Sequence, residues 1–465
     1  MRKTLPLVLA LALAGCSFTP DYQRPEAPVP VAWPPTVGAG DTATSAVMPT
    51  DWRAFFPDPR LQTLIAAALE HNRDLRIAVG RVNEARALAG IARADRLPTV
   101  DLPAQRAASL TPADLSGTGR QLSSQRYDIN LAVAAFELDF WGRVKSLDDA
   151  GRANFLASDY ARQAFRLSLI ADVANAWFSL LELGERLELA QATLKSREET
   201  RTLVGRRRDV GLAGDLDYLQ ADGAYQNARA EVASLARSHA AAENALRLLV
   251  GSAAFAAEGG KLAQPGLIAE VAAGLPSEVL LGRPDVMAAE QKLIAANANI
   301  GAARAAFLPK IVLTAALGTA SHGLSGLFGA GSGAWNFVPA LRLPLFDSGR
   351  SSDNVDLATA RKTIAVAEYE KTIQQAFREI ADLLSARAQL GEQLQAQEAG
   401  VAAQNQRLRI VDARYRAGVS SHLELLDAQR EQFAAQQSAL AVRRQLLSAS
   451  ASFYKALGGG DAASR

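Results

Sequence analysis

The chain contains one stretch of sequence twice. Residues 74–98 read DLRIAVGRVNEARALAGIARADRLP, and residues 285–309 read DVMAAEQKLIAANANIGAARAAFLP. The two stretches align without a gap and share ten identities, including the closing Leu-Pro. Their spacing of roughly two hundred residues is too long for a solenoid, whose units have about 20–50 residues. The repeat therefore predicts two similar structural halves that pack side by side.

Each half is predicted to begin with a helix, which covers about residues 60–96 in the first half. Leu-Pro ends this helix, because the residue before a proline avoids helical geometry. The repeat continues farther along, where Gly142-Arg143 recurs as Gly349-Arg350 and Gly211 recurs as Gly418. The intervening segments differ in length, as surface loops between strands can.

The segments that follow the two helices, about 99–140 and 310–346, have the period of β-strands. Apolar and polar residues alternate over 127–133, which is typical of a strand with one apolar face. A turn rich in Gly and Ser interrupts each segment, so each half is predicted to contain one β-hairpin. In the second hairpin, Trp335 and Phe337 suit an aromatic girdle at a lipid interface.

A long helical hairpin is predicted after each β-hairpin, at about 143–250 and about 348–457. The first helix of the first pair has no proline and shows the heptad spacing of a coiled coil, at Val173, Trp177, Leu180, Leu187 and Leu194. A helix of this length would extend about 100 Å at 1.5 Å per residue. We expect Gly211 and Gly418 to end the first helix of each hairpin.

These patterns divide the chain into six segments. We expect, in chain order, a lipoprotein signal peptide at 1–15, a lipid-anchored, proline-rich extended segment at 16–60, a first repeat at 61–250, an equatorial linker at 251–283, a second repeat at 284–457 and a flexible tail at 458–465.

The first residues have the pattern of a targeting segment. Arg2 and Lys3 precede an apolar run that ends at Ala14 and is too short to span a bilayer as a mature helix. The run leads to Cys16, as in bacterial lipoprotein signals, where the thiol receives a diacylglycerol after cleavage. Cys16 is the only cysteine, so no disulfide can form within the chain. The alternative is an ordinary secretory signal with a buried free thiol.

Charge and composition exclude several classes of protein. The chain has 50 Lys and Arg against 48 Asp and Glu and no long basic block, which argues against nucleic-acid binding. No apolar run after residue 16 reaches the length of a membrane-spanning helix, so strands would have to cross a membrane. The four histidines lack metal-ligand spacing and no nucleophile–base pair stands out. We therefore expect no enzyme activity, no metal and no cofactor apart from a covalent lipid on Cys16.

Four strands per chain are too few for a membrane barrel, since known membrane barrels have at least eight. An open sheet would leave its edge amides unpaired in lipid, at several kcal/mol each. Other copies of the chain must therefore complete the sheet. Two copies would give eight strands with a filled lumen, and three would give twelve strands with space for a solute.

Several motifs together resemble a known family. They are Leu-Ala-Gly-Cys at 13–16, the run from Asp51 to Phe56, Leu97-Pro98, the run from Leu281 to Val286, Leu308-Pro309, and the run from Arg414 to Gly418 with that from Leu423 to Asp427. From about Pro20 to Leu457 the chain resembles the outer-membrane efflux channels typified by TolC and OprM, in their lipoprotein branch. The resemblance implies an α+β membrane protein with two internal structural repeats. It would be a trimeric 12-stranded outer-membrane β-barrel, four strands per chain, continuous with a long periplasmic α-helical coiled-coil barrel.

The resemblance also implies a function. The protein would be the passive outer-membrane channel of a tripartite efflux system, lipid-anchored and largely periplasmic. Its partners would be two further copies of itself, a periplasmic adaptor, an inner-membrane pump and outer-membrane lipid. A conduit for type I protein secretion is the main alternative. A periplasmic adaptor and a structural coiled-coil lipoprotein are further ones, against which the repeated strand hairpins argue.

In the family, the turns at Gly211 and Gly418 form a periplasmic gate. Leu423 and Asp427 match its constricting rings of leucines and acids, and they lie four residues apart on one helical face. Arg414 matches an arginine that ties the closed gate to a neighbouring helix.

Further candidate gate residues are acidic. Glu424 follows Leu423, and its equivalent in the first half is Asp217. The equivalent of Asp427 in the first half is Gln220, which is not acidic. Three copies of Asp427 near one axis would repel each other unless protonated or solvated, which would favour cations and easy opening. The alternative for all these residues is a solvated helix end, where Asp and Glu are common.

Overall fold

The computed structural model describes residues 18–30, 51–252, 259–263, 268 and 277–459. The signal peptide, Cys16 and parts of the proline-rich segment, the linker and the tail lie outside this range. The described residues fall into two compact units. The sheet unit contains Arg81–Asp159, Ala288–Glu370 and the described residues up to Glu26, and the helical unit contains the rest. Both units draw on both sequence repeats.

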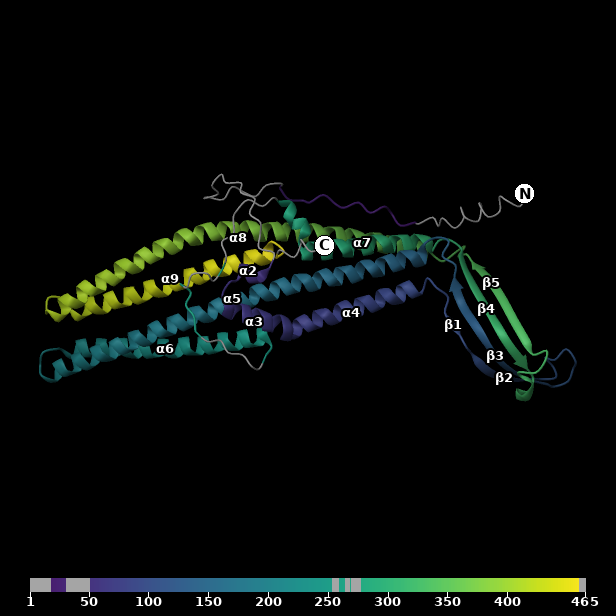
Figure 1. Cartoon of the computed structure of the whole chain (residues 1–465), viewed down its shortest axis with the longest axis horizontal. Helices are drawn as coiled ribbons and strands as arrows, with labels where there is room; N and C mark the ends of the chain where they lie inside the picture. Colours follow the sequence, from purple (N-terminus) through teal and green to yellow (C-terminus); the bar gives the residue numbers. More distant parts are fainter. Residues whose placement is uncertain (1–17, 31–50, 253–258, 264–267, 269–276, 460–465) are drawn as a thin grey trace. The chain divides into compact units, whose positions relative to one another are not determined.

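The sheet unit contains one antiparallel sheet (Figure 1). Two hairpins, β2–β3 and β4–β5, are joined by pairing of β3 with β4, and β1 pairs with β3 beyond the end of β2. The strands are β1 (Val100–Asp101), β2 (Ala104–Thr111), β3 (Leu122–Glu137), β4 (Lys310–Ser321) and β5 (Gly333–Arg342).

The four expected strands appear as five because Pro103 interrupts the first. Proline has no backbone N–H to donate to a neighbouring strand. Pairing nevertheless continues across the gap, since Asn130 N donates to Pro103 O at 3.2 Å. A second irregularity lies in β3 between Val133 and Phe136, where Ala135 has φ +54°. Such a bulge bends a strand and increases its twist.

Large apolar side chains remain exposed on the sheet. Leu131 lies opposite Leu317, which lies opposite Trp335, and Trp335 is 77% exposed. Soluble surfaces rarely expose a contiguous apolar patch of this kind unless it contacts lipid or another protein.

The helices that carry the sequence repeat are α4 (Arg73–Ala94) and α7 (Pro284–Ala305). In both, the leucine before the proline closes the last turn: Leu97 N donates to Ala94 O, and Leu308 N donates to Ala305 O. Small residues allow the helices of the sheet unit to approach closely. Gly151 of α5 (Arg143–Asp209) lies against Ala89 and Ala92 of α4, and Ala150 and Ala153 form a small core with Ala295 and Ala298 of α7.

The N-terminal segment is held against the sheet unit by polar contacts. Arg24 donates to both carboxylate oxygens of Glu290, at 2.7 and 2.9 Å, and Tyr22 OH donates to one of them at 3.1 Å. Asn297 Nδ2 donates to Pro20 O at 2.7 Å. The repeated glycine of α7, Gly301, has no room for a Cβ, because Thr19 occupies that space.

The two longest described helices, α5 (Arg143–Asp209) and α8 (Arg350–Arg416), have 67 residues each, and most of these residues belong to the helical unit. Each is followed by a shorter helix, α6 (Asp215–Val250) and α9 (His422–Ala456) respectively (Figure 1). Of the heptad positions in α5, the first three are buried, whereas Leu187 and Leu194 are partly exposed. The aromatic core includes Phe55, Phe56 and Tyr454, with ring centroids 4.8 to 5.7 Å apart.

The sequence prediction considered only uninterrupted apolar runs, and it therefore missed one apolar stretch in α5. Among the described helices, α5 contains an 18-residue window with a mean hydropathy of 1.3, which by length and composition could cross a membrane. In the structure 56% of that window is buried, and Trp177 and Phe178 of α5 are fully buried. Packing in the helical unit therefore accounts for its apolar character.

The prediction of a single helix at about 60–96 is wrong in one respect. It is divided into α3 (Pro59–His71) and α4 by Asn72, whose ψ of 130° is not helical. The buried Asn72 side chain accepts from Leu75 N at 2.8 Å and donates to Leu249 O at 2.9 Å. Asn is a preferred residue at the start of a helix, and here it also joins α3 to the end of α6.

The proline-rich segment was expected to be extended throughout, and this is wrong at its end. Residues 18–30 contain no helix or strand, but Trp52–Phe55 forms the short helix α2, capped by Asp51. Pro59 is the first residue of α3, with Asp58 as its cap. Proline suits that position because the first helical N–H needs no intrahelical acceptor.

Candidate functional site

The two helical hairpins end in turns of the same construction. Gly211 and Gly418 have φ of +75° and +76°, in the left-handed region that favours glycine. In both turns a backbone N–H donates to the carbonyl oxygen five residues earlier. Leu212 N donates to Arg207 O at 2.7 Å, and Val419 N donates to Arg414 O at 2.9 Å. This is the Schellman arrangement that commonly ends helices, so both glycines lie where the sequence predicted turns.

Two of the candidate acids lie at helix starts. Asp217 is in the first turn of α6 and accepts from Gly214 N at 3.4 Å. Glu424 is in the first turn of α9, where its backbone N donates to Ser421 Oγ at 3.2 Å. Acidic side chains at these positions are stabilised by the helix macrodipole. The Asp217 carboxylate therefore caps its helix, whereas only the backbone N–H of Glu424 takes part in capping. A role of either acid in the gate stays a prediction.

Asp427 has two cationic partners. Arg407 of α8 donates to one carboxylate oxygen at 2.6 Å, and Arg430 of α9 donates to the other at 2.7 Å. Leu423, one helical turn earlier, is 64% exposed. Within each chain, Arg407 and Arg430 offset the negative charge of Asp427. The repulsion expected between Asp427 residues of different chains is therefore weaker.

Next to the turns, Arg207 contacts the other hairpin, whereas its repeat equivalent Arg414 does not. Arg207 donates to Tyr415 OH at 3.4 Å, and its guanidinium lies 5.6 Å from the centre of that ring. The Arg414 side chain is exposed and makes no ion pair with any described residue.

His422 is a buried titratable group beside the second turn. Its ring packs edge-on against Tyr415 with centroids 5.7 Å apart, and neither ring nitrogen has a hydrogen-bond partner in the described part of the chain. Burial lowers the pKa of His422, the charges of Arg197 and Arg207 lower it further, and Asp217 opposes them. His422 is therefore neutral near pH 7.

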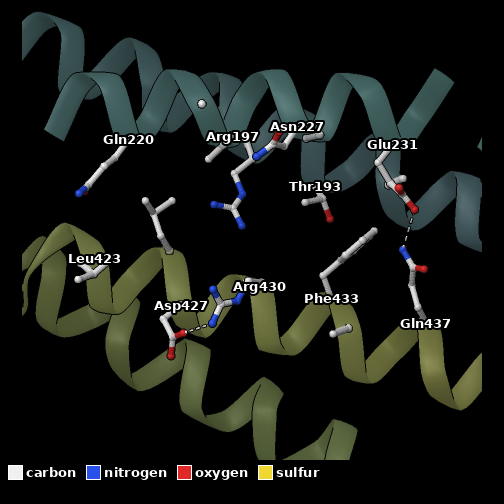
Figure 2. A pocket seen from close by; sticks show the side chains of 16 residues that line it. Thr193, Arg197, Gln220, Asn227, Glu231, Leu423, Asp427, Arg430, Phe433 and Gln437 are labelled. Carbon is white, nitrogen blue, oxygen red and sulfur yellow. Dashed lines mark hydrogen bonds and ion pairs between the residues drawn. The ribbon is translucent and has the colours of Figure 1, made fainter. Parts of the chain in front are cut away.

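A cavity of about 740 Å³ lies near the tips, between α5, α6 and α9 (Figure 2). Leu423 and Asp427 line it from α9, and Gln220, the repeat equivalent of Asp427, lines it from α6. The structure thus brings these three residues together. Asp217, Glu424 and Arg414 do not line the cavity.

Sequence reasoning missed several residues of this region. Arg430 could have been found, because it lies three residues after Asp427 on the same helix. Arg407 belongs to a different helix, and no sequence signal connects it to Asp427. Arg197, which lines the cavity from α5, carries no recognisable motif.

The comparisons with known proteins identify the family. The family described as "Outer membrane efflux protein" matches residues 64–252 and 275–459. The chain belongs to this family. It is therefore an outer-membrane efflux protein, as the motifs indicated.

Several relatives are similar over nearly their whole length. The toluene efflux pump outer membrane protein TtgF of Pseudomonas putida is 44% identical, over 98% of this chain and 96% of that protein. Outer membrane protein OprJ of Pseudomonas aeruginosa is 43% identical, over 98% and 95%. The open state of the MtrE outer membrane channel of Neisseria gonorrhoeae has a TM-score of 0.85 at 38% identity, over 96% of this chain and 98% of that one.

These relatives distinguish between the alternatives. They are named as efflux pump proteins and channels, which favours efflux over protein secretion. Membership of this family also does not favour a periplasmic adaptor or a purely structural coiled-coil lipoprotein. The relatives are channel proteins rather than enzymes.

Proposed function

We propose that this protein is the passive outer-membrane conduit of a tripartite efflux system. Small molecules expelled by an inner-membrane pump would enter through a periplasmic adaptor and leave the cell through this channel, without chemistry on the chain. The names of the relatives support this role, since TtgF is part of a toluene efflux pump and MtrE is an outer membrane channel.

The observation that carries the proposal is the incomplete sheet. Within the described residues, β5 pairs only with β4, and β1 and β2 pair only with β3. Both edges of this apolar sheet therefore keep unpaired backbone groups, which lipid cannot satisfy. Three copies joined edge to edge would close a twelve-stranded barrel with a lumen wide enough for solutes.

A lipid on Cys16 is part of the proposal. Thr19, three residues later, bonds through its hydroxyl to Ser146 of the sheet unit at 2.9 Å. Three extended residues span at most about 11 Å, so acyl chains on Cys16 would begin close to the unit that contains the sheet. The anchor and the barrel would then enter the same membrane.

We assign the periplasmic gate to the helix tips. Leu423 would narrow the pore, because it is exposed on the helix face that also carries Asp427. Asp427 would hold the closed state through its bonds to Arg407 and Arg430. The exposed Arg414 is available to a neighbouring subunit or to the adaptor, and so are the exposed apolar side chains of Leu212 and Val419 at the turns.

Conductance in planar bilayers tests the channel and its gate. Asp427→Asn removes the charge that holds Arg407 and Arg430, so we expect a larger open probability than in the unmodified protein. Glu392→Gln is the matched control, because it removes an exposed acid of α8 that makes no bond within the described residues. Absence of any trimer-dependent conductance would refute the conduit. Unchanged gating in Asp427→Asn would refute only the gate.

A further inference from the structure

Arg197 is a buried cation for which the described chain supplies no counter-charge. It is 8% exposed and points from α5 into the cavity near the tips (Figure 2). No described residue forms an ion pair or a side-chain hydrogen bond with its guanidinium. Burial lowers the pKa of Arg197, but arginine keeps its proton near neutral pH. The fold therefore holds a largely buried positive charge that no described residue pairs with.

Both carboxylates that line the cavity already have other partners. Asp427 accepts from Arg407 and Arg430, and Glu231 accepts from Gln437 Nε2 at 3.4 Å. Leaving a buried charge unpaired is costly. A negative group that enters the cavity from outside the chain would remove this cost at Arg197.

The rest of the lining is mostly apolar. The side chains that face the cavity beside Arg197 are small or hydrophobic: Ala190, Ala224, Ala228, Leu426, Phe433 and Ala434. Thr193, Gln220, Asn227 and Gln437 add neutral polar groups, and Arg430 adds a second cation, which is paired with Asp427. The volume of about 740 Å³ is in the range of small-molecule pockets, which combine an apolar wall with a few placed polar groups.

We propose that this cavity binds an amphiphilic organic anion. Its carboxylate or sulfonate would bond to Arg197, and its apolar body would lie against Leu426 and Phe433. The inference goes beyond a passive conduit, because it places a binding site for one class of solute in the wall of the helical unit. An acidic side chain of a neighbouring subunit is the competing partner for Arg197.

Binding of paired fluorinated probes to the purified full-length protein in detergent tests the proposal. The probes are 6-fluoro-2-naphthoate and its neutral amide, followed by ¹⁹F NMR. We expect saturable binding of the carboxylate, about tenfold or more weaker in Arg197→Gln, with amide binding unchanged. Arg206→Gln is the control, because it removes an exposed arginine of the same helix outside the cavity. Absence of saturable binding, or equal weakening in both variants, would refute the proposal.

Thermal unfolding without a probe separates the two possible partners. If Arg197 lacks a partner, the thermal unfolding midpoint of Arg197→Gln should equal or exceed that of the unmodified protein, because the substitution removes an unpaired buried charge. The naphthoate should then stabilise the unmodified protein and not the variant. A clearly lower midpoint in Arg197→Gln would show that a neighbouring subunit already pairs with Arg197, and the proposal would be wrong. Neither measurement depends on conduction, so the proposal and the conduit can fail separately.

Discussion

Arg283 joins three parts of the helical unit, and its removal should be among the most damaging substitutions in the chain. The residue is 4% exposed. It donates to Asp285 at 2.9 and 3.1 Å, to Glu379 of α8 at 2.8 Å, and to the backbone oxygen of Ala456 at the end of α9 at 2.7 Å. Arg283 lies in the motif from Leu281 to Val286 that carried the family resemblance.

The magnitude follows from these bonds. Hydrogen bonds to charged groups contribute about 1.5–3 kcal/mol each, and breaking a buried ion pair costs about 3–5 kcal/mol. Asp285 and Glu379 are about a third exposed and can regain water, so we expect the lower end, about 3 kcal/mol, for Arg283→Ala. At about 2 °C per kcal/mol, the unfolding midpoint would fall by about 6 °C.

Circular dichroism at a helical wavelength measures this midpoint in detergent. Arg378→Ala is the matched control, since Arg378 is an exposed arginine of α8 whose ion pair with Asp382 is 3.9 Å long. It should lower the midpoint by no more than about 1 °C. A midpoint of Arg283→Ala within 2 °C of the unmodified protein would show that these bonds do not hold the three segments together.

Three further predictions follow from other contacts. Burial lowers the pKa of His422 from its ordinary value of 6.5, so the folded state disfavours the proton. Stability should therefore fall as the pH drops below about 6.5, and His422→Gln, but not His71→Gln, should flatten this part of the pH profile of the midpoint. Glu290→Gln removes the carboxylate that Arg24 and Tyr22 share, and should increase proteolysis between residues 18 and 30, whereas Glu70→Gln should not. Asn72→Ala removes a helix cap and should cost about 1–2 kcal/mol in chemical unfolding, and an unchanged midpoint would contradict the assigned role of Asn72.

Periodic features of the sequence predicted the main elements well. The alternation over 127–133 lies inside β3, and the proline-free stretch after Trp141 became α5. Both glycine turns occur where the repeat placed them, because only glycine adopts a positive φ at little cost.

Contacts between distant segments could not be predicted in this way. The break at Asn72 depends on Leu249 O, and the partners of Asp427 include Arg407 on another helix. Neither pairing leaves a periodic signal in the sequence. The buried environment of Arg197 is likewise set by helices that are distant in sequence, so the residue was not singled out.

The number of chains in one particle tests the central claim most directly. Native mass spectrometry of the purified protein, released from detergent, measures this number. Because β5 and the β1–β2 edge are unpaired within the described chain, we predict particles of three chains. Particles of a single chain with an intact sheet spectrum would contradict the claim that sister chains complete the barrel.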